Sequence, residues 1–175
     1  MNEVQIQSRR AVLSGNLIIP KNAVALVLFA HGSGSSRHSP RNRFVARTLN
    51  QAGLATLLFD LLTAEEEATD MYTREHRFNI GLLAERLVHA TKWAKQQDET
   101  RDLPIGYFGS STGGAAALVA AAQIPQDLGA VVSRGGRHQS RGPFWRIRRR
   151  LTRLVWLAGY PGNRKACDRL GRCDE

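Results

Sequence analysis

Four mostly apolar runs dominate the sequence, and each has the length of a strand that is buried on both faces of a sheet. They span Ala23–Ala30, Leu54–Asp60, Leu103–Gly109 and Leu128–Ser133. Two segments near the N-terminus alternate apolar with polar residues instead, as half-buried strands do. These segments span Glu3–Gln7 and Gly15–Pro20. The pattern therefore predicts six strands.

Helical patterns separate the later runs. Ser39 followed by Pro40 predicts the start of a helix, and Gly53 predicts its end. The apolar side of this helix is expected to hold Phe44, Val45, Leu49 and Ala52. The acidic run Glu65–Glu67 is assigned to the long connection that follows the next strand.

Two further helices are predicted in the second half of the chain. The first is long and amphipathic, with apolar residues at spacings of three and four. Those residues are Ile80, Leu83, Leu87, Ala90 and Ala94. The second is rich in small residues and spans Gly113–Gln123.

Strands that alternate with helices predict a three-layer α/β fold, with a mainly parallel sheet covered by helices on both faces. Binding and catalytic residues in such sheets lie beyond the C-terminal ends of the strands. Two loops rich in glycine and serine follow strands at that edge, His31–Ser36 and Gly109–Gly113. We therefore expect a functional site where these two loops meet.

With 175 residues, of which 42% are hydrophobic, the chain is long enough for one globular domain. No stretch reaches the roughly 18 apolar residues that a membrane span requires, and the N-terminus has no secretory pattern. Cys167 and Cys173, the two cysteines, lie close to the C-terminus. The default expectation is therefore a reducing, cytoplasmic setting. The oligomeric state is left open.

The formal net charge of +10 is concentrated in the last fifth of the chain. Residues 1–140 hold 15 Lys and Arg against 12 acids, a difference of +3, and residues 141–175 hold 10 against 3, a difference of +7. From Gly136 onward no buried strand is predicted, although apolar residues fit a basic amphipathic helix. These residues are Phe144, Ile147, Leu151 and Leu154. We divide the chain into a domain over 1–137 and a basic tail over 138–175.

Residues 109–113, Gly-Ser-Ser-Thr-Gly, fit the G-x-S-x-G pattern of a nucleophile elbow between a strand and a helix. The serine of such an elbow sits on a strained turn, which needs small residues two positions away on either side. Its hydroxyl projects above the sheet, and the helix N-terminus favours negative charge that develops there. We therefore predict Ser111 as a nucleophile, against the simpler alternative of an ordinary Gly-Ser turn.

The earlier loop, which begins at His31, follows a buried strand at the place where the second oxyanion-hole donor of such a site is found. The predicted donors are the backbone N–H groups of Ser33 and Thr112, and losing one such donor typically raises the barrier by about 3 kcal/mol. His31 itself is expected to brace the loop. The alternative is a phosphate-binding loop. It is disfavoured because the Walker lysine is absent and G-x-G-x-x-G does not fit.

Four segments occur in a distinctive order: LVLFAHGSGSSRHSPRN, LATLLFDLLT, LPIGYFGSSTGGAAALVAAA and AVVSRGG. Together they resemble the dienelactone-hydrolase-like branch of the α/β-hydrolases, from about Ser14 to Gly136. The resemblance implies a serine hydrolase that attacks the carbonyl carbon of a small ester or lactone and needs no cofactor or metal. Ser111 matches the nucleophile, and Ser33 and Thr112 match the oxyanion positions. Some relatives are fused to phosphoribosyltransferase domains, of which this sequence shows no sign.

The resemblance also implies a catalytic aspartate and then a histidine after the last matched strand, in the triad order serine, acid, histidine. No histidine follows His138, and Asp168 and Asp174 lie in a polar terminus. We therefore expect the C-terminal strands of the fold, the acid and the histidine to be missing. The hydrolase activity would then be impaired, as in a truncated or frameshifted product.

The remaining histidines offer no clear substitute. His76 and His89 belong with the long helix and are expected at the surface. His38 follows the loop that begins at His31, and His138 follows a strand, so both could lie near Ser111, but neither takes the base position of the family. The competing hypothesis is a non-catalytic protein whose basic tail, with Trp145 and Trp156, binds nucleic acid, an anionic membrane or an acidic partner.

Overall fold

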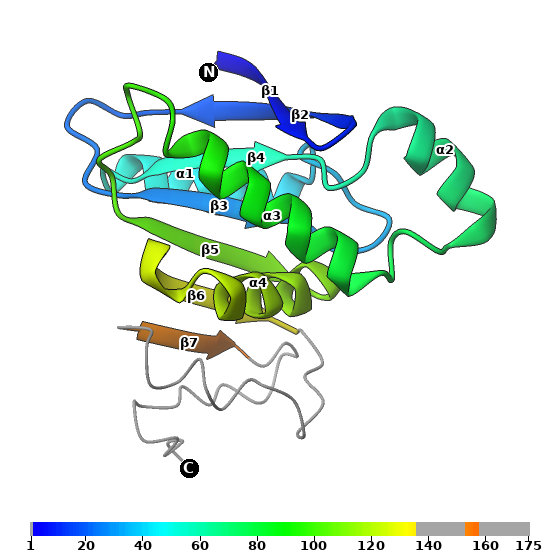
Figure 1. Cartoon of the computed structure of the whole chain (residues 1–175). Helices are drawn as coiled ribbons and strands as arrows, with labels where there is room; N and C mark the ends of the chain where they lie inside the picture. The colour runs from blue at the N-terminus through cyan, green and yellow to red at the C-terminus, as the bar shows by residue number, and fades with distance from the viewer. Residues whose placement is uncertain (1, 136–152, 158–175) are drawn as a thin grey trace, which may run out of the picture.

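The computed structural model describes residues 2–135 and 153–157, which form a single seven-stranded sheet with its helices (Figure 1). The strands are β1 (Asn2–Ser8), β2 (Ala11–Ile18), β3 (Leu26–Ala30), β4 (Ala55–Phe59), β5 (Ile105–Ser110), β6 (Leu128–Arg134) and β7 (Arg153–Leu157). Their order in the sheet is β1-β2-β4-β3-β5-β6-β7. β3 to β7 are parallel, whereas β1 and β2 form an antiparallel hairpin that joins the sheet beside β4.

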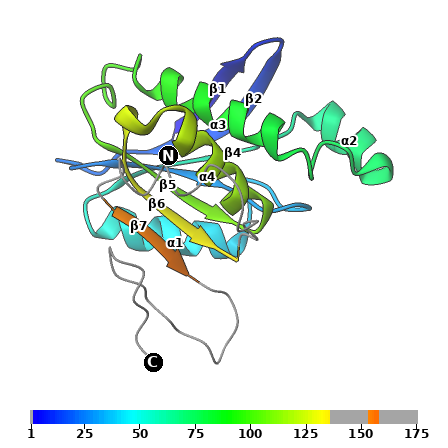
Figure 2. The ribbon, with the colours of Figure 1, turned by 60° about the horizontal axis from the view of Figure 1, so that its bottom comes forward.

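Helices cover both faces of this sheet, so the predicted three-layer α/β fold is confirmed. α3 (Ile80–Ala94) and α4 (Thr112–Gln123) pack against each other on one face, and α1 (Pro40–Gln51) lies on the other (Figure 2). A short 3-10 turn, Pro125–Asp127, leads into β6. In the described part of the chain, no helix has the length and hydropathy needed to cross a membrane.

The core lies between the sheet and the pair α3 and α4. Its largest fully buried side chains come from the central strands and include Leu26, Leu28, Leu57, Ile105, Tyr107 and Val131. The Tyr107 hydroxyl shares a hydrogen bond with that of Thr91 on α3, at 2.5 Å. The predicted apolar side of α3 is confirmed, because four of its five residues are buried there, namely Leu83, Leu87, Ala90 and Ala94. Each large apolar side chain buried in this way contributes roughly 1.5–3 kcal/mol.

α1 begins where it was predicted, and its predicted apolar side is confirmed in part: Val45 and Leu49 pack against the core, whereas Phe44 and Ala52 are exposed. The Ser39 hydroxyl accepts the N–H of Asn42 at 3.4 Å, and Gly53, just past the end of the helix, has a φ of 79°. Asn42 and Ala46 are buried, whereas Phe44 is 71% exposed. The expectation that Phe44 packs inward is wrong. A helix turns by about 100° per residue, so Phe44, two residues from both Asn42 and Ala46, points away from the sheet when those two residues face it.

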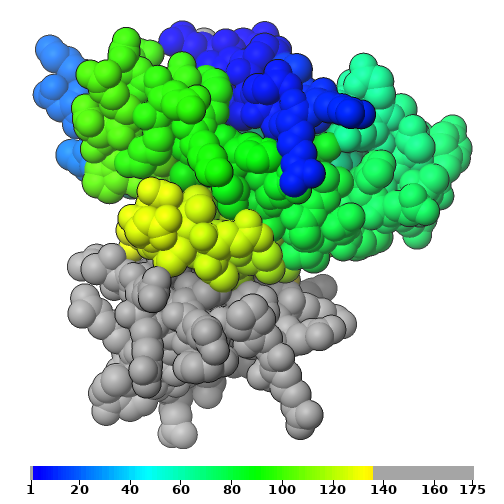
Figure 3. Space-filling model, viewed as in Figure 1, coloured from blue at the N-terminus to red at the C-terminus, as the bar shows by residue number. Residues whose placement is uncertain are grey.

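The acidic run that we assigned to a connection forms a helix, α2 (Ala64–Thr73), so that assignment is wrong. The Thr63 hydroxyl accepts the N–H of Glu66, and the Glu66 carboxylate accepts the N–H of Thr63. This reciprocal capping box starts the helix, and the acids of its first turn complement the positive N-terminal dipole. α2 follows β4 and forms the protruding end of the molecule at the right of Figure 3.

β7 corrects the expectation that no strand follows residue 136. Its backbone pairs in parallel with β6, from Ala130 opposite Arg153 to Arg134 opposite Leu157. The helical spacing that included Leu154 is therefore wrong at that residue. The physical reason is that the edge of β6 offers unpaired N–H and C=O groups, and pairing with them overrides a local pattern. The rest of the predicted helix lies outside the described residues, as do His138, Trp145, Cys167, Asp168, Cys173, Asp174 and the proposed boundary at residue 137.

One buried ion pair fixes α2 against α3. The Arg86 side chain is 5% exposed, and its guanidinium donates to both carboxylate oxygens of Glu66, at 2.5 and 2.6 Å. The same guanidinium donates to the carbonyl of Leu61, just after β4, at 2.6 Å. The Arg86 guanidinium holds the pKa of Glu66 below its usual range. This pair therefore joins α2, α3 and the end of β4.

We predict that Glu66→Gln lowers the free energy of unfolding at pH 7 by about 2 kcal/mol, because the Arg86 guanidinium stays buried without a charged partner. Urea denaturation measures the loss. The difference from wild type should shrink as the pH falls below the usual Glu pKa of 4.5, because protonation of Glu66 removes the same interaction. Glu75→Gln is the control, since Glu75 is exposed and makes no ion pair with a described residue. Equal losses in the two variants would contradict the prediction.

Candidate functional site

The turn between β5 and α4 holds Ser111 in a backbone conformation that few residues other than glycine adopt, with φ 53° and ψ −122°. The Ser111 N–H donates to the carbonyl of Arg134 at 2.9 Å, which ties the turn to the end of β6. Ser111 is exposed at the C-terminal edge of the sheet. α4 begins at the next residue, Thr112, so the first N–H groups of this helix have no partner within it.

No side chain fits at the two glycines that flank Ser111. A Cβ atom on Gly113 would lie 2.2 Å from the carbonyl oxygen of Ala30 and 2.3 Å from that of His31. A Cβ on Gly109 would lie 2.5 Å from the carbonyl oxygen of Gly113. These obstacles are backbone atoms, so no side-chain rotation relieves them. The small residues that the elbow pattern requires are a steric necessity here.

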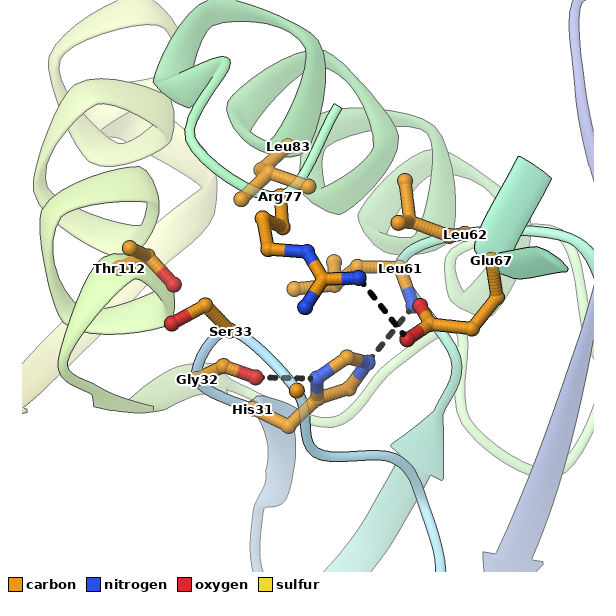
Figure 4. Close-up of a pocket in the computed structure, with 10 residues that line it drawn as sticks. His31, Gly32, Ser33, Leu61, Leu62, Glu67, Arg77, Leu83 and Thr112 are labelled. Carbon is orange, nitrogen blue, oxygen red and sulfur yellow. Dashed lines mark hydrogen bonds and ion pairs between the residues drawn. The ribbon is translucent and has the colours of Figure 1, made fainter. Parts of the chain in front are cut away.

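The loop after β3 lies directly against this turn. A Cβ on Gly32 would lie 3.2 Å from both the carbonyl oxygen of Ser110 and the Cβ of Ser111. Ser33, the next residue, is exposed, and its hydroxyl points toward that of Thr112 (Figure 4). The Thr112 hydroxyl oxygen is buried and has no hydrogen-bond partner among the described residues. The structure therefore brings Ser111, Ser33 and Thr112, the three residues predicted from the sequence, to one edge of the sheet.

His31 joins the ends of two strands. It is 7% exposed, its Nε2 accepts the N–H of Leu61 at 3.0 Å, and its Nδ1 lies 3.0 Å from the carbonyl of Gly32. A ring nitrogen that accepts is unprotonated, so Nδ1 carries the hydrogen and donates to Gly32. Burial lowers the pKa of His31, in agreement with a neutral ring. The expected role of His31 as a brace for the loop is confirmed by these contacts.

Arg77 also enters the site, and sequence reasoning missed it. Its Nε donates to Asp70 at 2.5 Å, and its Nη2 lies 3.7 Å from the Glu67 carboxylate. Burial opposes the ionisation of Asp70, but hydrogen bonds from Arg77 and from the His76 N–H outweigh it and keep its pKa below the usual range. Arg77, Ser33 and Thr112 line a cavity of about 10 Å³, room for one water molecule (Figure 4). In the sequence, Arg77 is distinguished only by the acidic residues that precede it. Those acids lie on α2, a helix that was not predicted.

A larger groove opens on the other side of the same loop. We call it the Ser111 groove, and its volume is about 1190 Å³. It is lined by Gly32–Ser36 after β3, by 38–42 at the start of α1, by Ser110 and Ser111, and by Arg134 and Gly135 after β6. Among the residues that the structure describes, Ser111 therefore faces open space rather than packed side chains.

The histidines lie in different surroundings. His38 is exposed and lines the Ser111 groove. His76 and His89 are half-buried rather than fully at the surface, and neither lines this groove. Within residues 2–135, no hydrogen bond joins the Ser111 hydroxyl to a histidine or a carboxylate.

Comparison with known proteins gives one consistent family. A family model described as alpha/beta hydrolase fold matches residues 25–174. The crystal structure of a dienelactone hydrolase from Anabaena variabilis is 49% identical, with a TM-score of 0.80 over 90% of this chain and 85% of that one. An alpha-beta serine hydrolase homologue from Coxiella burnetii shares the fold at 16% identity, with a TM-score of 0.70 over 90% of this chain and 73% of that one.

Curated relatives carry a different name. Two strains of Mycobacterium tuberculosis have a protein named putative phosphoribosyl transferase that is 55% identical over 135 residues. The match covers 77% of this chain but 30% of that relative, so this chain spans under a third of the relative's length. This agrees with the expectation that some relatives join this domain to another.

We predict that His31 makes the stability of the protein depend on pH. The unfolded chain takes up a proton near the ordinary histidine pKa of 6.5, whereas burial keeps the folded ring neutral to lower pH. The free energy of unfolding should therefore fall as the pH drops below about 6.5, and this slope should be reduced in His31→Gln. Urea denaturation between pH 7.5 and 5 measures both proteins, with His89→Gln as the control. An unchanged slope in His31→Gln would disprove the assignment of a neutral ring.

Proposed function

The chain belongs to the α/β-hydrolase family, in its dienelactone-hydrolase-like branch, and we propose that it carries the nucleophile half of a serine hydrolase site for small esters or lactones. One observation carries the proposal, namely the exposed Ser111 with a positive φ between two glycines that have no room for a side chain. A conformation of this kind costs roughly 1–3 kcal/mol and persists only where the surroundings impose it. Holding a hydroxyl above the sheet is the chemical use of that strain.

In the proposed reaction, the Ser111 oxygen attacks the carbonyl carbon of the substrate while its proton passes to a base. The carbonyl electron pair moves onto oxygen, and the N–H groups of Ser33 and Thr112 hold the resulting oxyanion. When the carbonyl re-forms, the bond to the leaving alcohol breaks and the alcohol takes up the proton. Water then cleaves the acyl-serine ester, which releases the acid and restores the hydroxyl.

The described part of the site holds no group that is positioned to activate Ser111. In the described residues its hydroxyl has no histidine or carboxylate partner, and the sequence has no histidine after His138. We therefore propose that this 175-residue chain turns over slowly. An oxyanion hole and substrate binding without a complete triad still give roughly 10³–10⁴-fold acceleration over water. Reaction with a strongly activated electrophile is then faster than turnover of an ordinary ester.

We further propose that residues 1–137 form the body of the hydrolase domain, to which β7 (Arg153–Leu157) adds a strand, and that the rest of residues 138–175 forms a basic tail. The excess of seven positive charges in residues 141–175 favours a second candidate function, the binding of nucleic acid or an anionic membrane by that tail.

We predict that a fluorophosphonate labels Ser111 and that Ser111→Ala abolishes the labelling. Ser110→Ala is the matched control, because Ser110 is the preceding hydroxyl on the same turn and is not at the nucleophile position of the pattern. Peptide mass spectrometry identifies the labelled residue, and a burst of p-nitrophenol from p-nitrophenyl acetate measures acylation. Labelling that persists in Ser111→Ala, or that falls on another residue, would refute the assignment.

For the second candidate, we predict that replacing Arg148, Arg149 and Arg150 by glutamine lowers retention on anionic liposomes or single-stranded DNA. Sedimentation with vesicles and a filter-binding assay at increasing salt measure the effect. Equal retention of the triple variant and the wild-type chain would remove this candidate and leave the hydrolase proposal unaffected.

A further inference from the structure

Basic and acidic residues lie on opposite sides of the loop after β3, at the edge of the sheet that holds Ser111. The described charged residues that line the Ser111 groove are all basic or histidine, namely His38, Arg41 and Arg134. The cavity on the opposite side of the loop after β3, beside α2, is lined by Asp60, Glu65 and Glu67, and Arg37 is the one cation among its described lining residues. The groove that Ser111 faces is therefore the positive side of the site.

The two arginines of the groove are not neutralised by the protein. In the described part of the chain, neither Arg41 nor Arg134 forms an ion pair. By contrast, the arginines that support the neighbouring loops are all paired with carboxylates: Arg37 with Asp60, Arg77 with Asp70, and Arg86 with Glu66. Structural arginines in this domain thus have acidic partners, whereas those of the groove are available to a ligand.

Two helices add positive potential to the same groove. α1 and α4 both begin at its wall, and neither has an acidic residue in its first turn. α2 differs, because three glutamates occupy its first turn. A helix N-terminus carries roughly half a positive charge, which here adds to that of the arginines.

We propose that the Ser111 groove binds a phosphate monoester group of the substrate, held by Arg41 and Arg134 with His38 beside them. The inference rests on the proposed function, because it assigns a substrate class to the Ser111 site. The charge and shape of a phosphate group match this groove. A dianion with three acceptor oxygens matches two guanidinium groups and two helix N-termini, whereas one carboxylate would leave part of that charge unbalanced.

This mode of binding differs from the glycine-rich phosphate loop that the sequence disfavoured. There, successive backbone N–H groups enclose the phosphate and a lysine reaches it. Here the contacts come from side chains on α1 and at the end of β6, in an open groove. Binding in such an exposed place is weak and falls with added salt.

The test is isothermal titration of the full chain with glycerol 3-phosphate at low salt, with glycerol and succinate as comparison ligands. We expect millimolar binding of glycerol 3-phosphate, at least fivefold weaker binding of succinate and none of glycerol. Arg41→Gln and Arg134→Gln should each weaken glycerol 3-phosphate binding at least fivefold. Arg47→Gln, on the exposed side of α1 and outside the groove, and the triple variant of Arg148–Arg150 should bind as wild type does.

Equal binding of succinate would overturn the assignment to phosphate, and equal losses in Arg47→Gln or the tail variant would overturn the assignment to this groove. Circular dichroism verifies that each variant is folded, and exposed Arg41 keeps the test valid if Arg134→Gln does not fold. Glycerol 3-phosphate should also slow fluorophosphonate labelling of Ser111. If Ser111 is not labelled at all, the proposed function fails, while calorimetry with the Arg41 variant still decides the phosphate site.

Discussion

The contact of Gly113 with the backbone at the end of β3 is the constraint on which the rest of this site depends. Because a Cβ there would meet the carbonyl oxygens of Ala30 and His31 at 2.2–2.3 Å, the first turn of α4 can lie against β3 only when residue 113 is glycine. This approach brings the loop that contains Ser33 within reach of Thr112. It also leaves the turn between β5 and α4 so tight that Ser111 must adopt a positive φ. The exposure of the serine and the closeness of the loop at Gly32 to the turn therefore have one steric cause.

Two ion pairs and one hydrogen bond hold the neighbouring segments in place at this edge of the sheet. Arg86 with Glu66 fixes α2 against the end of β4, Arg77 with Asp70 shapes the chain between α2 and α3, and His31 joins the loop after β3 to Leu61. These groups are buried or half-buried, and each finds its partner inside the protein, as burial requires. Arg41 and Arg134, which face the Ser111 groove, form no ion pair with a described residue. The same residue type is thus paired where it supports the fold and unpaired, among the described residues, where it faces the groove.

How much of this could be predicted from the sequence depends on how local each cause is. The elbow and the loop with Ser33 were predictable, because glycine spacing and buried strands are determined within a few residues. α2 was also detectable, since its Thr63-x-x-Glu66 capping box lies in the sequence, but a run of acids was mistaken for a connection. The orientation of Phe44 depends on which side of α1 meets the sheet, and β7 depends on an open edge of β6. Arg77 could not be assigned to the site, because its position follows from the fold of α2 and from Asp70 rather than from any pattern around it.

The geometry of Ser111 and its proposed activation have separate physical origins in this protein. Residues 30–33 and 109–113 build the turn and the loop beside it at the ends of β3 and β5, which pair in parallel inside the sheet. In the proposed reaction the base is a separate group, because within residues 2–135 no histidine or carboxylate is hydrogen-bonded to the Ser111 hydroxyl and yet the turn is strained. Strain of roughly 1–3 kcal/mol at Ser111 can therefore persist whether or not a base is present. The rate of reaction with an activated electrophile therefore depends on the geometry of the turn at Ser111, whereas the rate of ester turnover depends on the base. A change in one rate need not be accompanied by a change in the other.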